Sequence, residues 1–224
     1  MDNGYRPQTL QEQAAAQLRT MLVEGRIEPG TRLNERQLAL TLRVSPTPLR
    51  EAMALLAAEG LLELLPSRAA VAVKLGADDI RHSFELLAML ESQGGELAAG
   101  RIDEAARDAL LALHRELRAC HARGDLSGYC RIDERIHAAI NAAAANPLLT
   151  EAHRSICGRV QHLRFRALQD PVLWRQALVE HEEMMAALAA RDGAALGALL
   201  RSHLERKREV LLARLHAQAC QLNG

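Results

Sequence analysis

The scarcity of aromatic residues limits the fold of this chain more than any other feature of its sequence. Phe, Trp and Tyr make up 2% of the 224 residues, while Ala and Leu dominate the apolar composition. A β-sandwich or barrel usually draws on more aromatic and β-branched side chains than this. Ala and Leu instead favour helix. The sequence therefore predicts a mostly α protein.

Composition and charge exclude several classes of protein. Hydrophobic residues make up 49% and charged residues 25%, the balance of a globular chain. There is no apolar stretch near the roughly 18 residues of a membrane span, and the polar N-terminus does not resemble a signal peptide, so we expect a cytoplasmic protein. The 28 basic and 28 acidic residues exclude a bulk polycation that coats nucleic acid but leave room for a local basic surface. The four cysteines lack C-x-x-C spacing and are expected to be reduced and inert.

The first third of the chain has the pattern of a helix-turn-helix followed by a hairpin. The sequence predicts a domain over residues 1–75, a linker over 76–78 and a second domain over 79–218. After a first helix that ends near Gly25, the segment ERQLALTL is preceded by Asn34 as its N-cap. The segment RVS then leads into PTPLREAMALLAAEG, and the later segments LLELL and AVAV flank the turn of a short hairpin.

Such a motif places the start of its second helix in the major groove of DNA. The side chains and free amides at Ser45 and Thr47 suit phosphate contacts, and Arg50 has the reach for guanine or phosphate. Arg36 is expected to reach the DNA backbone or the same groove, and Arg68 lies in the predicted wing. The alternative for each residue is an ordinary helix cap or a solvated surface side chain.

The sequence of the second domain predicts six helices, and Gly94-Gly95 is expected to interrupt the first of them. Asp133 and His137 are four residues apart and share one helix face. His181 and His203 flank the turn at residues 191–193 at equal distances, which brings them level, roughly 16 Å from the turn, if both arms are antiparallel helices. Three imidazoles and a carboxylate would suit Zn²⁺, or Ni²⁺, Mn²⁺ or Fe²⁺ if water completes the shell. The alternative is a set of ordinary core or surface side chains, which is also the expectation for the other histidines.

The N-terminal segment resembles the winged helix-turn-helix of GntR-type bacterial transcription regulators. The resemblance rests on L-x-E-x-x-L-A, V-S-x-T-P-L-R-E-A and L-x-x-E-G-L-L and covers about residues 9–75. It implies that four residues of the motif contact DNA, namely Arg36, Ser45, Thr47 and Arg50. Pro46 and Ala69 depart from the family pattern, which commonly has arginine and glycine there. These departures affect operator sequence and the wing contact rather than DNA binding itself.

Residues 79 to about 215 resemble the FCD effector domain of FadR-type members of the same family. The matching features are D-x-x-x-H at 133–137, E-H-x-x-M-x-x-A-L at 180–188, the R-D-G-A-A turn and the late His203. The resemblance implies a divalent metal held by those four side chains, beside a small carboxylate effector. Leu87 replaces an arginine that the family commonly has near the effector, and an apolar side chain cannot pair with a carboxylate. Arg164 and Arg166 are candidates for the replacement charge.

These features predict a homodimeric, effector-controlled transcription regulator, most simply a repressor, that binds a roughly palindromic operator. One alternative is a metal-dependent, hydrolase-like helical enzyme. That enzyme lacks sequence support, because H-E-x-x-H, G-x-S-x-G, G-x-G-x-x-G and Walker-type motifs are all missing. Another alternative is a helical interaction module without DNA-binding activity. Salt-dependent binding to palindromic DNA separates the regulator from both alternatives.

Overall fold

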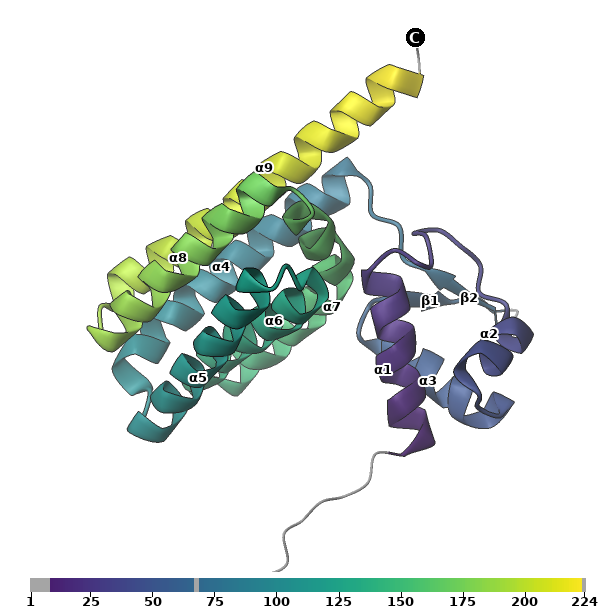
Figure 1. The fold of residues 1–224 in the computed structure, drawn as a ribbon, viewed down its shortest axis with the longest axis horizontal. Coiled ribbons are helices and arrows are strands. Elements are labelled where there is room, and N and C mark those ends of the chain that lie inside the picture. The colour runs from purple at the N-terminus through teal and green to yellow at the C-terminus, as the bar shows by residue number, and fades with distance from the viewer. Residues whose placement is uncertain (1–8, 67–68, 223–224) are drawn as a thin grey trace, which may run out of the picture. The chain divides into compact units, whose positions relative to one another are not determined.

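The structure is a computed structural model that describes residues 9–66 and 69–222 (Figure 1). The chain divides between Lys74 and Leu75 into two compact units. The N-terminal unit contains α1 (Leu10–Val23), α2 (Glu35–Leu42), α3 (Pro46–Ala58), β1 (Leu62–Leu64) and β2 (Ala70–Ala72). The C-terminal unit contains α4 (Ala77–Arg101), α5 (Glu104–Ala122), α6 (Leu126–Ala143), α7 (Pro147–Leu168), α8 (Pro171–Ala189) and α9 (Gly193–Leu222). The predicted mostly α fold is confirmed, and no described helix has the length and apolarity needed to cross a membrane.

Local signals explain the turn between α2 and α3. The side chain of Asn34 accepts a hydrogen bond from the backbone N–H of Gln37, which caps α2. Arg43 ends α2 in the left-handed conformation, with φ 55°. Ser45 then starts α3, and Pro46 occupies the first helical position, where no backbone donor is needed. The hydroxyl of Ser45 makes no capping hydrogen bond to the described residues, so it remains available to a ligand.

The hairpin after α3 is a small antiparallel sheet, and its strand β2 also pairs with the loop between α1 and α2. Leu62 pairs with Ala72 and Leu64 with Ala70, and Arg32 forms an isolated bridge to the middle of β2. The predicted wing contact, Arg68, lies outside the described residues.

Helix α4 is central to the C-terminal unit, because it packs against α6, α7, α8 and α9. Figure 1 shows α4 and α9 running side by side over much of their length. The tight turn between α8 and α9 is tied to the end of α4. The guanidinium of Arg191, a residue with φ 57°, donates hydrogen bonds to the backbone oxygens of Ala99 and Ile102.

The predicted interruption at Gly94-Gly95 is wrong, because α4 continues through both residues. Both glycines are buried at helix contacts. A Cβ on Gly94 would overlap the side-chain oxygen of Asn141, and a Cβ on Gly95 would overlap the side chain of Leu200. Their role is therefore to permit close packing of α4 against α6 and α9 rather than to break the helix.

Gly193 and Gly197 allow the same close approach from the side of α9. A Cβ on Gly193 would lie 2.6 Å from the backbone oxygen of Glu96, and one on Gly197 would lie 2.8 Å from that of Ser92. Backbone atoms within a helix cannot move aside as the end of a flexible side chain can. The two helices therefore depend on these glycines for their spacing.

We expect Gly197→Ala to destabilise the protein by about 1–3 kcal/mol through overpacking. Gly100→Ala is the matched control, since a Cβ added to this helical glycine would meet no described atom within 4 Å. It should stabilise the protein by up to about 1 kcal/mol through helix propensity alone. Urea denaturation of both variants measures their free energies of unfolding. Equal changes of the same sign in the two variants would contradict this expectation.

Candidate functional site

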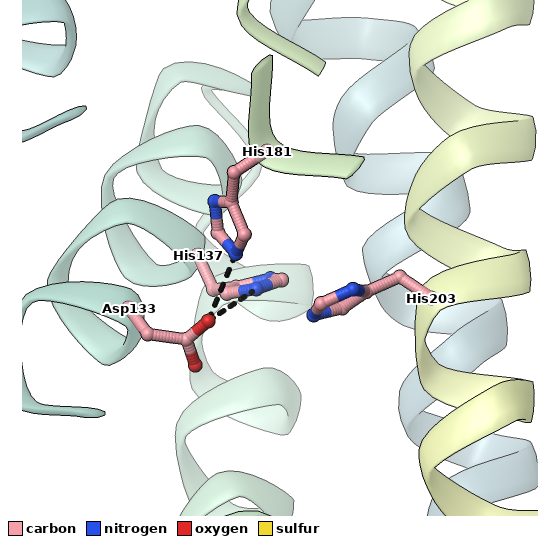
Figure 2. Close-up of side chains that lie close together, drawn as sticks. All are labelled: Asp133, His137, His181 and His203. Carbon is pink, nitrogen blue, oxygen red and sulfur yellow. Dashed lines mark hydrogen bonds and ion pairs between the residues drawn. The ribbon is translucent and has the colours of Figure 1, made fainter. Parts of the chain in front are cut away.

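Four buried side chains from three helices converge inside the C-terminal unit. Asp133 and His137 come from α6, His181 from α8 and His203 from α9. Each offers a ligand atom, and these atoms all lie within 4.8 Å of one another. The three imidazole centroids are 5.2–5.3 Å apart. Figure 2 shows the rings and the carboxylate facing a common centre, so the structure brings together the four residues singled out by their spacing.

Two further carboxylates orient two of these imidazoles from behind. Nδ1 of His137 donates to Glu91 at 2.5 Å, and Nδ1 of His203 donates to Glu180 at 2.5 Å. The opposite nitrogen, Nε2, of each ring is buried and has no hydrogen-bond partner among the described residues. A carboxylate behind a metal-ligating histidine fixes its ring orientation and raises its basicity. The arrangement therefore fits two imidazoles prepared to bind a cation through Nε2.

The third imidazole, that of His181, is hydrogen-bonded to Asp133, which is itself one of the four candidate ligands. Nε2 of His181 donates to Asp133 at 2.8 Å, a contact that Figure 2 draws as a dashed line. Burial lowers the pKa of His181 to about 4. Burial, together with the positive charge of Lys207, also holds the pKa of His203 well below its usual value. Both rings are therefore neutral near pH 7, the protonation state in which imidazole binds metals.

His137 differs from the other two rings. Burial alone would lower its pKa, but the adjacent Glu91 carboxylate raises the pKa above its ordinary value. The ring therefore retains a proton more readily, and a bound cation would have to displace the proton on Nε2. Metal binding here would accordingly release protons.

Asp133 stays ionised because two cations compensate its burial. Nη2 of Arg164 donates to Oδ2 at 2.9 Å, and Nζ of Lys207 is 3.7 Å from Oδ1. Burial alone would raise the pKa of Asp133, but Lys207 and Arg164 hold the pKa well below its usual value. The carboxylate is thus available as a negatively charged ligand at neutral pH.

The N-terminal unit presents its predicted DNA contacts to solvent. Arg36, Ser45, Thr47 and Arg50 are all exposed. Nε of Arg50 donates to Glu35 at 2.9 Å, which links α3 to α2. Three of these side chains, from Ser45, Thr47 and Arg50, come from the first turns of α3 or its cap. This is the end of a recognition helix that enters the major groove in helix-turn-helix proteins.

Comparison with known families decides the class of protein. Residues 10–71 match the bacterial regulatory proteins of the gntR family, and residues 82–206 match the FCD domain. The chain belongs to the GntR family, in the group that carries an FCD domain. It is therefore a DNA-binding transcription regulator, and the enzyme alternative is set aside.

Relatives of this GntR regulator match it over most of their length. It is 30% identical to the Nta operon transcriptional regulator of Aminobacter aminovorans over 86% of this chain and 90% of that protein. It is 25% identical to the HTH-type transcriptional repressor RspR of Escherichia coli over 88% of this chain and 87% of that one. The solved structure of E. coli McbR/YncC has the same fold, with a TM-score of 0.79 and 22% identity over 93% of this chain and 100% of that chain.

The two candidate effector residues of the regulator have different environments. Arg164 is buried, at 5% exposure, and contacts Asp133. Arg166 is exposed on α7. Of the two arginines, Arg164 therefore lies at the centre and Arg166 does not contact it.

Sequence reasoning missed four buried residues around the centre: Glu91, His153, Glu180 and Lys207. Lys207 follows His203 by four residues, and His153 precedes Cys157 by four residues. A search for i, i+4 pairs of polar residues would therefore have flagged Lys207 and His153. Glu180 precedes a predicted ligand directly. Glu91 had no such local signal, because its partners come from helices distant in sequence.

Proposed function

We propose that this regulator is a repressor controlled by a divalent metal ion and a small organic acid. Asp133, His137, His181 and His203 would hold the ion. One oxygen and three imidazole nitrogens suit Zn²⁺, and Ni²⁺, Mn²⁺ or Fe²⁺ would fit if water filled further positions. The relative RspR is named a transcriptional repressor, which supports repression rather than activation for this chain.

The observation that carries the metal proposal is a pair of buried Nε2 atoms that make no hydrogen bond to any described residue, although Nε2 of His137 lies 3.7 Å from Oδ1 of Asp133. Each belongs to a fully buried ring of His137 or His203 whose other nitrogen is already bonded to a carboxylate. A buried polar atom without a partner is destabilising by about 1–3 kcal/mol. A cation at the common centre would satisfy both atoms at once.

An anionic effector is favoured by the charges around the centre. The carboxylates of Asp133, Glu91 and Glu180 are balanced by Arg164 and Lys207 inside the unit and by the half-exposed Arg206 beside Glu180. A divalent ion adds positive charge that none of these groups offsets. A carboxylate bound between the ion and Lys207 would offset it. The ammonium of Lys207 is 1% exposed and has no hydrogen-bond partner in the described part of the chain.

Lys207→Met tests this coupling between ion and anion. With acetate as the probe, at an ionic strength matched with chloride, acetate should tighten zinc binding by wild type about 5-fold or more. The variant should lose most of that gain. Without acetate, the variant should bind zinc more tightly than wild type, because a cation facing Asp133 has been removed.

Competition with a chromophoric chelator measures these zinc affinities. Lys74→Met, a change at an exposed lysine in the other unit, is the control and should behave like wild type. An equal gain from acetate in wild type and Lys207→Met, or no gain in wild type, would contradict the effector proposal. The failure of wild type to bind zinc at all would instead contradict the metal proposal.

For the DNA-binding unit we propose a homodimer that presents two α3 helices to successive major grooves of a palindromic operator. Such a protein acts on chromosomal DNA in the cytoplasm. Ser45 and Thr47 would contact phosphates at the start of α3. Arg50, aligned by Glu35, would contact a base edge, and Arg36 would contact the backbone.

Arg50→Ala should weaken binding to the specific operator by about 1–3 kcal/mol and relax sequence preference at the contacted base pair. Arg36→Ala should weaken binding to all sequences about equally. It should also reduce the slope of log affinity against log salt concentration by about 1, the value for one lost phosphate contact. Arg81→Ala, at an exposed arginine of α4, is the control. Fluorescence anisotropy with a duplex selected by the protein from a random pool measures these effects. Unchanged affinity and preference in Arg50→Ala would rule out its role.

A further inference from the structure

We propose that Glu91, His153 and Cys157 form a second metal site, which contains a thiolate and takes an ion of the zinc class. Glu91 lies on α4, and the other two residues lie four apart on α7, so they share one face of that helix. Their ligand atoms all lie within 4.8 Å of one another. None of the three belongs to the group of four ligands described above.

The distances suit a shared ion. Nε2 of His153 is 3.1 Å from Oε1 of Glu91 and 3.2 Å from Sγ of Cys157. In a tetrahedral site with Zn–N and Zn–O near 2.0 Å and Zn–S near 2.3 Å, neighbouring ligand atoms are about 3.3–3.5 Å apart. The two contacts of Nε2 therefore need to lengthen by only a few tenths of an ångström to admit an ion, and the remaining pair, Oε1 and Sγ, lies within 4.8 Å. A water molecule would complete the shell.

The donor set also balances the charge of the ion. A carboxylate and a thiolate neutralise a divalent cation, and His153 adds a neutral nitrogen. Binding converts the Cys157 thiol to a thiolate, and its proton passes to solvent. Nη1 of Arg164 donates to Sγ at 3.9 Å and lies 3.9 Å from Oε1 of Glu91, so its positive charge would stabilise the thiolate. Cys157 is partly exposed, whereas Glu91 and His153 are buried.

Glu91 would connect this site to the four-residue centre. Its Oε1 faces His153, whereas its Oε2 accepts the hydrogen bond from Nδ1 of His137. An ion bound at Oε1 would withdraw charge from the carboxylate that orients His137. Occupancy of the second site would thereby alter the affinity of the first, through one shared side chain.

Cobalt substitution tests the second site, because a cysteine ligand gives Co²⁺ a thiolate charge-transfer absorption band that nitrogen and oxygen ligands do not give. The protein is stripped with chelator, loaded with Co²⁺ and assayed for this band and for bound cobalt. Wild type should bind about two ions per chain and show the band. Cys157→Ser should lose the band and about one ion, and His153→Gln should weaken cobalt binding at this site at least tenfold.

Two control variants separate this proposal from the first metal site. Asp133→Ala should keep the band while losing about one ion, so failure of the four-residue centre leaves the test intact. Cys130→Ser removes a partly buried cysteine outside the proposed site and should keep both the band and the second ion. Circular dichroism checks that each variant retains its helices. No thiolate band in wild type, or a band that persists in Cys157→Ser, would overturn the proposal.

Discussion

Three buried carboxylates, those of Glu91, Asp133 and Glu180, govern the structure of the helical unit. Each is at most 4% exposed, and an ionised carboxylate in that environment is stable only when it is paired. The pairing groups come from other helices: His137 and His153 for Glu91, Arg164 and His181 for Asp133, and His203 and Arg206 for Glu180. Pairing therefore fixes how α4, α6, α7, α8 and α9 meet.

The same pairing prepares the imidazoles for a ligand. A carboxylate behind His137 and another behind His203 leave Nε2 of each ring buried and without a hydrogen bond to any described residue. Regulation requires that ligand binding favour one state of the protein over another. A cation and an anion that join α6, α8 and α9 would stabilise one packing of these helices. Linkage then requires that DNA binding alter effector affinity to the same extent.

Local signals made much of the fold predictable. Asn34, Pro46 and Gly60 mark helix starts and stops by chemistry within a few residues, so the helix-turn-helix and its hairpin follow from the sequence. The four candidate ligands also follow, from i, i+4 spacing and from two arms of equal length. The role of Gly94 and Gly95 depends on Asn141 and Leu200, which are distant in sequence. The partners of Glu91 and Lys207 are likewise set by packing between helices, which no local pattern encodes.

The zinc content of protein purified without a histidine tag tests the central claim most directly. Asp133→Ala and His181→Ala should each bind about one zinc ion per chain fewer than wild type. His162→Gln, at a buried histidine outside both clusters, should bind as much as wild type. Folded Asp133→Ala and His181→Ala proteins that retain the zinc content of wild type would contradict the account.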